Sequence, residues 1–347
     1  MDARDTPEQA ELRRTASQLA RQLGPRNVAD IHDGTRAKRL AEAVRDAGWL
    51  ELRHDGGDGE PLASGVEAAI IADALAGTVA DVAFAGPVLA SDLARRAGSS
   101  PSDGAVVAFS PDLIDAAEVP GPATTTPIYA VDCATESRNS AYVLVPDGGG
   151  YHLAQVQVDT ANDGADLTRT IHPIPADTPL LEVPGQRRIL TADDLDSWAA
   201  LGLALTSADL VGLMRGVLDL TVAYAADRRQ YGVPVGSFQA VQHLLAEARC
   251  LMEGSLSVEL HASWAVDSLG PGEARAAGRV AKAYCARAAR TVCETAVQVH
   301  GGMGNTWDCI VHAYLRRALL SSQWFGDDGE QLRHLQRERL GVTDGLS

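Results

Sequence analysis

The stretch "YAADRRQYGVPVGSFQ", residues 224–239, joins two long helical patterns through a short turn. Pro234 ends the first pattern, because proline cannot continue a helix, and the second pattern begins near Phe238. Arg228 and Gln239 therefore lie on either side of one helix–helix corner. An arginine fork binds phosphate oxygens in a bidentate way, and a glutamine offers a donor and an acceptor to a base or a ribose. Taken alone, either residue is better explained as an ordinary surface side chain.

The chain on both sides of this corner has the pattern of a helical bundle. Small and apolar residues recur at three- and four-residue steps upstream of the corner, as on one buried helix face: Leu210, Met214, Val217, Thr221 and Tyr224. A third long helix is expected to begin at Pro271 and a fourth near Thr306. Long helices with short connections predict a four-helix bundle.

A second notable stretch, "QVHGGMG" at residues 298–304, places three glycines directly after the third helical pattern. In a Rossmann or P-loop motif the glycines lie between a strand and the helix that they open, so the order here is reversed. Gly301 is expected to take the left-handed conformation that ends a helix. On this segment alone, a helix C-cap is the favoured interpretation.

The two remaining regions differ in their sequence patterns. Residues 1–103 contain three helical patterns, the first opened by a capping box of Thr6 and Gln9. Residues 104–190 contain short β-rich runs, with "VPDGGG" at 145–150 as a tight turn between two strands. We predict an α+β fold, mostly α, with an N-terminal helical domain (1–103), a small antiparallel β domain (104–190) and a C-terminal helical bundle (191–347).

Composition excludes several classes of function. The chain of 347 residues carries 30 basic and 46 acidic residues, a net charge of −16, which opposes binding to nucleic acid or to an anionic membrane. Its five cysteines are scattered without a C-x-x-C pair, which is typical of reduced thiols and argues against a zinc site. No signal-peptide pattern and no apolar run long enough to cross a membrane is present in the sequence. These features predict a cytoplasmic protein that binds no metal.

Taken with the order of regions, the two motifs resemble the acyl-CoA dehydrogenase family. That family carries R-x-x-[FY]-G-x-P-[IV]-x-x-F-Q and later Q-[VIL]-x-G-G-x-G in its bundle, matched here by residues 228–239 and 298–304. "GADLTRT" at residues 164–170 also resembles the aspartate-threonine-arginine turn of the family's middle domain. The resemblance spans nearly the whole chain, and the two bundle motifs are specific as a pair.

The resemblance implies FAD as cofactor, with these motifs holding its ADP part across a dimer interface. By that resemblance Arg228 contacts the pyrophosphate and Gln239 the adenylate part. The backbone groups of Gln298 to Gly302 would also contact the cofactor, because the glycines allow it to approach closely. The residues thus assigned to FAD are Arg228, Tyr231, Gln239, Gln298, Val299, His300, Gly301 and Gly302. The His300 side chain itself is expected to pack or bond locally.

The sequence departs from the family at the catalytic base. The family removes the substrate's α-proton with a glutamate, found in one of two places. Counting from the motifs puts Phe325 at one place and Gly202 at the other, and neither side chain accepts a proton. A gap could bring Asp327 or Asp328 to the first place, although an aspartate is one methylene shorter. The family's T-E-P-x-x-G-S-D loop and W-I-[TS]-N strand, which touch the flavin ring, are also missing from the middle region. Trp307, Trp324 and Phe325 are expected to fill the bundle or a subunit interface.

Three hypotheses follow. In the first, the chain resembles the smaller, base-lacking subunit of actinobacterial α2β2 steroid-CoA dehydrogenases. It would be an enzyme only with a second acyl-CoA dehydrogenase-like subunit, acting on an acyl-CoA and passing electrons to electron-transfer flavoprotein. In the second, it is a homo-oligomeric FAD enzyme with a base such as Asp327. In the third, it is a structural or binding protein of the same fold without flavin.

Overall fold

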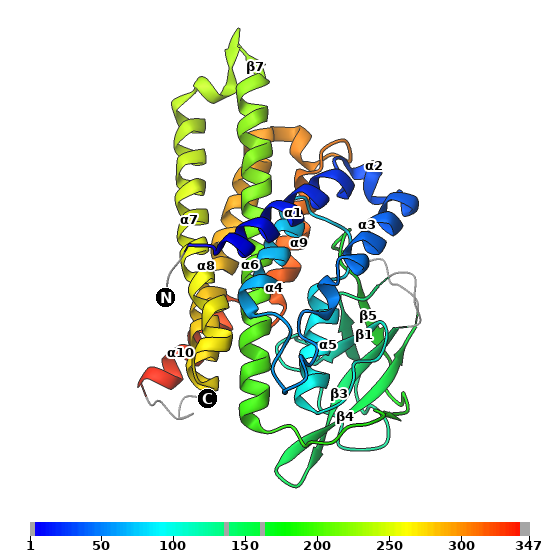
Figure 1. Ribbon diagram of the computed structural model, residues 1–347. Coiled ribbons are helices and arrows are strands. Elements are labelled where there is room, and N and C mark those ends of the chain that lie inside the picture. The colour runs from blue at the N-terminus through cyan, green and yellow to red at the C-terminus, as the bar shows by residue number, and fades with distance from the viewer. Residues whose placement is uncertain (1–3, 135–138, 160–163, 341–347) are drawn as a thin grey trace.

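The structure of the protein is a computed structural model that describes residues 4–134, 139–159 and 164–340. Figure 1 shows long helices of the C-terminal half standing on one side and a small sheet on the other, with the N-terminal helices packed against both. The sequence prediction of a mostly helical fold with a small β region and a C-terminal bundle is confirmed. The exact division into three domains stays a prediction.

The N-terminal part is helical. Its elements are α1 (Pro7–Leu23), α2 (Val28–Ile31), α3 (Gly34–Asp46), η1 (Trp49–Glu51), α4 (Gly65–Ala76) and α5 (Ala85–Arg96). The predicted capping box is present, since the Thr6 side chain accepts from the backbone of Gln9 and the Gln9 side chain accepts from the backbone of Thr6. Helix α4 is buried along almost its whole length between the other helices, which explains its uniformly apolar sequence.

The middle part forms one sheet of six strands in the order β5-β2-β1-β3-β4-β6. The strands are β1 (Ala105–Phe109), β2 (Ile128–Val131), β3 (Asn139–Asp147), β4 (Gly150–Val158), β5 (Ile171–Ile174) and β6 (Leu181–Glu182). The predicted turn is present between β3 and β4, where Gly148 and Gly149 have φ of +57° and +100°. The sheet is mixed rather than fully antiparallel, because β1 pairs parallel with β3. Strand β2 pairs with the opposite edge of β1, so the chain between β2 and β3 passes from one side of β1 to the other.

The C-terminal part is dominated by α6 (Ala192–Asp227), α7 (Gln239–Ser268) and α8 (Pro271–His300). The shorter elements are β7 (Arg229–Gln230), β8 (Val233–Pro234), η2 (Val235–Ser237), η3 (Gly301–Asn305), α9 (Val311–Gln323) and α10 (Asp328–Leu340). The fourth long helix, α9, begins at Val311 rather than near the predicted Thr306, because residues 306–310 form turns after η3. Among the described residues, α6 has the length and composition of a membrane span, but 94% of its most apolar window is buried within the protein, as in a core helix.

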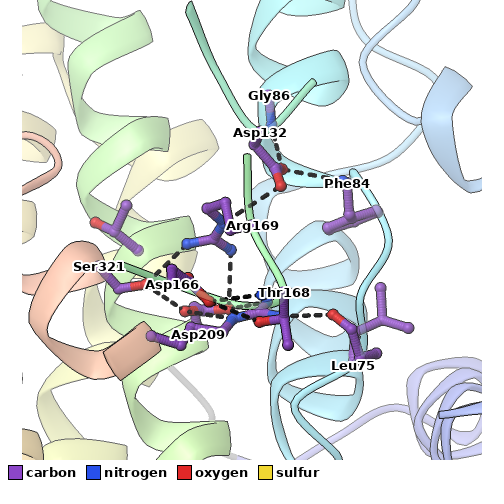
Figure 2. Close-up of polar contacts among 12 residues, drawn as sticks. Leu75, Phe84, Gly86, Asp132, Asp166, Thr168, Arg169, Asp209 and Ser321 are labelled. Atoms are coloured by element: carbon purple, nitrogen blue, oxygen red, sulfur yellow. Dashed lines mark hydrogen bonds and ion pairs between the residues drawn. The ribbon is translucent and has the colours of Figure 1, made fainter. Parts of the chain in front are cut away.

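A buried ionic cluster ties the three parts of the chain together (Figure 2). Arg169, just before β5, donates to Asp132 Oδ1 at 3.2 Å and to Asp209 Oδ1 of α6 at 3.1 Å. It also donates to Ser321 Oγ of α9 at 2.8 Å, and Arg317 Nη2 reaches Asp209 Oδ1 at 2.6 Å. Burial raises the pKa of Asp209, but Arg169 and Arg317 outweigh it and hold that pKa far below its usual range. The aspartate-threonine-arginine turn therefore has a structural role.

A second buried cluster joins α1, α4, α6 and α7. Asp73 Oδ2 accepts from Arg13 at 3.1 Å and from Arg215 at 2.7 Å. Nearby, Glu259 is buried on α7 and accepts from Ser263 Oγ at 2.5 Å. Burial, with a smaller contribution from the Asp73 charge, raises the pKa of Glu259 to about 7. Glu259 is thus protonated in the folded chain at mildly acidic pH, while Asp73 shares its charge with both arginines.

Replacing this glutamate should alter how stability depends on pH. The folded pKa is about 7 against an ordinary value of 4.5, so the folded chain holds a proton that the unfolded chain loses between these values. The free energy of unfolding of the wild type should therefore fall as pH rises from 4.5 to 7 and then level off. Glu259→Gln should abolish that fall and be more stable than wild type by about 3 kcal/mol at pH 8. Urea titrations across this pH range measure it.

Glu253→Gln is the matched control on the same helix, since Glu253 is exposed and pairs with Arg249. It should leave the pH profile of the wild type unchanged. A Glu259→Gln profile that still falls between mildly acidic and neutral pH would contradict the expectation.

Candidate functional site

The corner between α6 and α7 carries exposed polar side chains that make no hydrogen bond or ion pair with any described residue. It projects beyond the rest of the bundle as the short β7–β8 hairpin (Figure 1). Arg228 caps the C-terminal end of α6, and Gln239 begins α7. Both side chains are exposed, and neither forms a hydrogen bond or ion pair with any described residue. A guanidinium and an amide held free at a fixed corner suit an external anionic, hydrogen-bonding ligand.

Tyr231 at the tip of this hairpin is held in an unfavourable conformation. Its φ is +51°, followed by +83° at Gly232, and its side chain is 95% exposed. A non-glycine residue in the left-handed region carries backbone strain, and such strain is common at functional sites. The pairing of β7 with β8 enforces this conformation, because a two-residue hairpin turn of this kind needs positive φ at both central residues. The tyrosine ring is therefore presented outward, available to a cofactor or a partner.

The two sequence motifs meet through a ring contact. Tyr224 near the end of α6 stacks on His300 at the end of α8, with centroids 4.2 Å apart and planes at 21°. The His300 ring is buried, and its Nδ1 lies 2.9 Å from the Ala296 carbonyl oxygen. The expectation that this side chain packs and bonds locally is confirmed. The His300 side chain is thus engaged within the chain through its ring and Nδ1, whereas Gln298 is exposed and Val299 is half-buried.

Two of the glycines after α8, Gly301 and Gly302, have open space where a side chain would lie. Gly301 ends the helix with φ +63° and ψ −146°, so the positive φ is as predicted, but ψ lies outside the left-handed helical region. A Cβ at Gly301 or Gly302 would meet no atom within 4 Å. A Cβ at Gly304, by contrast, would lie 2.8 Å from the Val297 carbonyl oxygen. Gly301 and Gly302 thus leave bare backbone open to an external group, which fits the ADP part of an FAD.

The two positions at which the resemblance places a catalytic base touch each other. The ring of Phe325 lies on Gly202 of α6 so closely that a Cβ there would be 2.0 Å from Phe325 Cζ. Phe325 is 4% exposed and belongs to a cluster with Phe109, Trp198 and Trp324. Trp324 is also fully buried, as expected, whereas Trp307 is 60% exposed. Neither base position can accept a proton.

The two acidic residues that follow have structural surroundings. Asp327 Oδ1 accepts from the Glu330 backbone N–H at 2.8 Å, so its carboxylate caps the N-terminus of α10. Asp328 is the first residue of that helix. A carboxylate engaged in capping is a poor candidate for a mobile base. The aspartate alternative is thereby weakened.

Sequence reasoning missed the residues that hold this cluster in place. Lys282 of α8 is fully buried and donates to the carbonyl oxygens of Ser321 and, at 2.7 Å, Trp324. These carbonyls lie at the end of α9, where a helix leaves acceptors unsatisfied. Burial lowers the pKa of Lys282 to about 7. Nothing in the local sequence around Lys282 distinguishes it from a surface lysine.

Comparison with known proteins agrees with this geometry. Residues 202–340 match the profile of the acyl-CoA dehydrogenase C-terminal domain. This part of the chain belongs to the acyl-CoA dehydrogenase family.

Individual relatives extend the match beyond the bundle. The chain is 34% identical to the acyl-CoA dehydrogenase FadE34 of Mycobacterium tuberculosis over 280 residues, covering 74% of this chain and 37% of FadE34. It therefore spans less than half the length of that relative. The fold is similar to a chain of the ChsE4-ChsE5 complex from Mycobacterium tuberculosis, with TM-score 0.79, 22% identity and coverage of 99% and 100% of the two chains. A variant of the Tcur3481-Tcur3483 steroid ACAD gives TM-score 0.76, 20% identity and coverage of 96% and 99%.

Proposed function

We propose that this chain is the non-catalytic subunit of a heteromeric, FAD-dependent acyl-CoA dehydrogenase. The observation that carries the proposal is the contact of Phe325 with Gly202, because it leaves an aromatic ring on a glycine where the family has its base. Such a chain has no group at that place to take the α-proton of an acyl-CoA. A second acyl-CoA dehydrogenase-like chain supplies the catalytic glutamate, in an α2β2 assembly.

The contribution of this chain is the half-site for the ADP end of the cofactor. When bound, FAD supplies the acceptor for the hydride that leaves the substrate. Arg228 binds the pyrophosphate, Gln239 the adenylate part, and the backbone of Gln298–Gly302 approaches the cofactor closely. Tyr231 packs against the same ligand or the partner. The side chains of Arg228, Tyr231 and Gln239 are exposed and form no hydrogen bond or ion pair with any described residue, whereas the His300 ring is buried and only positions its segment.

The proposal extends to the substrate class and the electron acceptor. We propose a steroid side-chain CoA thioester as substrate, supported by the fold shared with a steroid ACAD assembly. We further propose electron-transfer flavoprotein as the acceptor, as is usual for the family. The acidic chain has no part in nucleic-acid or membrane binding in this proposal.

Co-expression with candidate partner chains from the same genome tests the proposal. The chain should be colourless alone and should form a yellow complex with a partner that carries the glutamate. Replacing that partner glutamate by glutamine should abolish acyl-CoA oxidation while the flavin stays bound. A chain that is yellow and oxidises acyl-CoA without a partner would overturn the proposal in favour of a homo-oligomeric enzyme. A well-folded, colourless chain that is indifferent to every partner would leave a structural protein.

Two glycine variants separate a cofactor contact from a structural role. Gly302→Ala should leave the free energy of unfolding of the isolated chain within about 0.5 kcal/mol of wild type, because a Cβ there meets no atom within 4 Å. In the complex it should raise the dissociation constant of FAD about tenfold by crowding the approach of the cofactor. Flavin fluorescence titrations of the apo complex measure this constant.

Gly304→Ala is the matched control, because Gly304 lies only two residues after Gly302. Its Cβ would meet the Val297 carbonyl oxygen at 2.8 Å, so it should destabilise the isolated chain by about 1–2 kcal/mol. Equal FAD affinity for Gly302→Ala and wild-type complexes would show that these glycines do not border the cofactor.

A further inference from the structure

The cluster around Phe325 has the form of a filled pocket. Its ring centroid lies 5.2 Å from that of Phe109, 5.3 Å from that of Trp198 and 5.9 Å from that of Trp324. These neighbours come from β1, from α6 and from the end of α9. The fourth side is Gly202, whose missing side chain gives the ring its place. One aromatic ring is thus enclosed by walls from separate parts of the chain.

The walls are fixed by contacts that do not involve Phe325. Trp198 Nε1 donates to the Leu89 carbonyl oxygen of α5 at 3.0 Å. The guanidinium of Arg169 lies 5.1 Å from the centroid of the Trp324 ring, and Lys282 holds the Trp324 carbonyl oxygen. Phe109 is held by its strand pairing with Tyr129. Removing the Phe325 ring therefore leaves each wall with its own anchor.

The backbone that delivers the ring is strained. Phe325 has φ +65°, and its N–H donates at 2.8 Å to the carbonyl oxygen of Leu113, which has φ +61°. Two bulky residues in the left-handed region are unusual, and such outliers persist where the surroundings enforce them. Trp324 adds a second anomaly, since its buried Nε1 has no acceptor in the described residues. A core built for stability alone rarely leaves a buried donor unsatisfied.

We propose that the Phe325 side chain occupies a preformed apolar pocket of this chain, which without that ring admits a flat aromatic ring or a short acyl group. This inference rests on the proposed function. In a non-catalytic subunit, the filled pocket is the physical reason why the subunit holds no substrate of its own. The chain therefore lacks a catalytic base at this place, and one of its own side chains also fills the pocket. While Phe325 is in place, its ring fills this space.

Phe325→Gly tests the proposal with the chain as it exists. Glycine adopts φ near +65° without strain, so this variant removes the ring and relieves the backbone together. Benzene is the probe, because rigid apolar cavities of ring size bind it. The variant should bind one benzene per chain in a saturable calorimetric titration, with a melting temperature raised by ~3 °C near saturation. The wild type should show neither effect.

A second variant keeps the test decisive if Phe325→Gly folds poorly. Phe325→Leu fills part of the pocket and should bind benzene several-fold more weakly than Phe325→Gly, or not at all. Soluble, cooperatively folded Phe325→Gly without benzene binding would show that the walls collapse and would overturn the proposal. Benzene binding by the wild type equal to that of the variant would overturn it too, because the pocket would then be open.

The outcome is separable from that of the proposed function. The benzene titration uses the isolated chain and needs neither partner nor flavin. Failure of benzene binding with an intact yellow complex removes the pocket and keeps the subunit role. Benzene binding by Phe325→Gly in a chain that never assembles with a partner keeps the pocket and removes the subunit role.

Discussion

Gly202→Ala is expected to lower the free energy of unfolding by about 3 kcal/mol or more. The new Cβ would lie 2.0 Å from Phe325 Cζ and about as close to two further ring carbons, at 2.4 and 2.5 Å. Real carbon atoms do not approach to such distances, so the ring or α6 must shift. The ring cannot move freely because Phe109 and Trp198 enclose it. Alanine favours a helix over glycine by about 1 kcal/mol, and this gain is smaller than the cost of the clash.

A double-mutant cycle assigns the effect to one contact. In a Phe325→Gly background the ring is gone, so Gly202→Ala should become neutral or stabilise the chain by up to about 1 kcal/mol. Urea denaturation of the four proteins gives the coupling energy. Gly272→Ala is the matched control, because Gly272 lies in the first turn of α8 and a Cβ there meets no atom within 4 Å. If Gly202→Ala behaves like Gly272→Ala, the two base positions are not in contact.

This contact also marks the limit of what sequence could predict. Counting from the motifs identified Gly202 and Phe325 as the two positions without a base. Periodicity and punctuation predicted most of the long helices, including the start of α8 at Pro271 and its end at Gly301, but not α5 or α10. Such signals are local, since they reflect which face of one element is buried. They do not encode which distant element covers that face, so the packing of Phe325 on Gly202 was not predicted.

The same limit explains why the sequence predicted neither the parallel strand pair in the sheet nor the buried charged residues. The β-rich runs of the middle region were recognisable, but the pairing of β1 with β3 depends on how the chain returns past β2. Lys282 and Asp209 look like surface residues in a list of letters, yet both are buried. Burial of a charge is tolerated only with partners from other elements, which local sequence does not reveal. The placement of Arg228, Tyr231 and Gln239 at one exposed corner follows from motif spacing, and their cofactor role stays a prediction.

Arg169→Met is expected to destabilise the chain by about 3–5 kcal/mol, because removing one partner of a buried ion pair leaves the others uncompensated. Asp132 and Asp209 would both lose a guanidinium, and Ser321 would lose a donor. Arg169→Lys should recover little of this loss. One ammonium cannot reproduce the planar fork that reaches the loop after β2, α6 and α9 together (Figure 2).

The loss should not be uniform along the chain. Arg317 would still hold Asp209 against α9, with Nη2 at 2.6 Å, so the link between α6 and α9 should survive. Asp132 would keep only the backbone N–H groups of Phe84 and Gly86, so β2 and β5 should open first. Hydrogen exchange of Arg169→Met should therefore rise most in these two strands. Arg249→Met, which breaks an exposed pair with Glu253, should cost no more than about 0.5 kcal/mol. Exchange that rises equally in α6 and in β5 would show that the guanidinium does not join the sheet to the bundle.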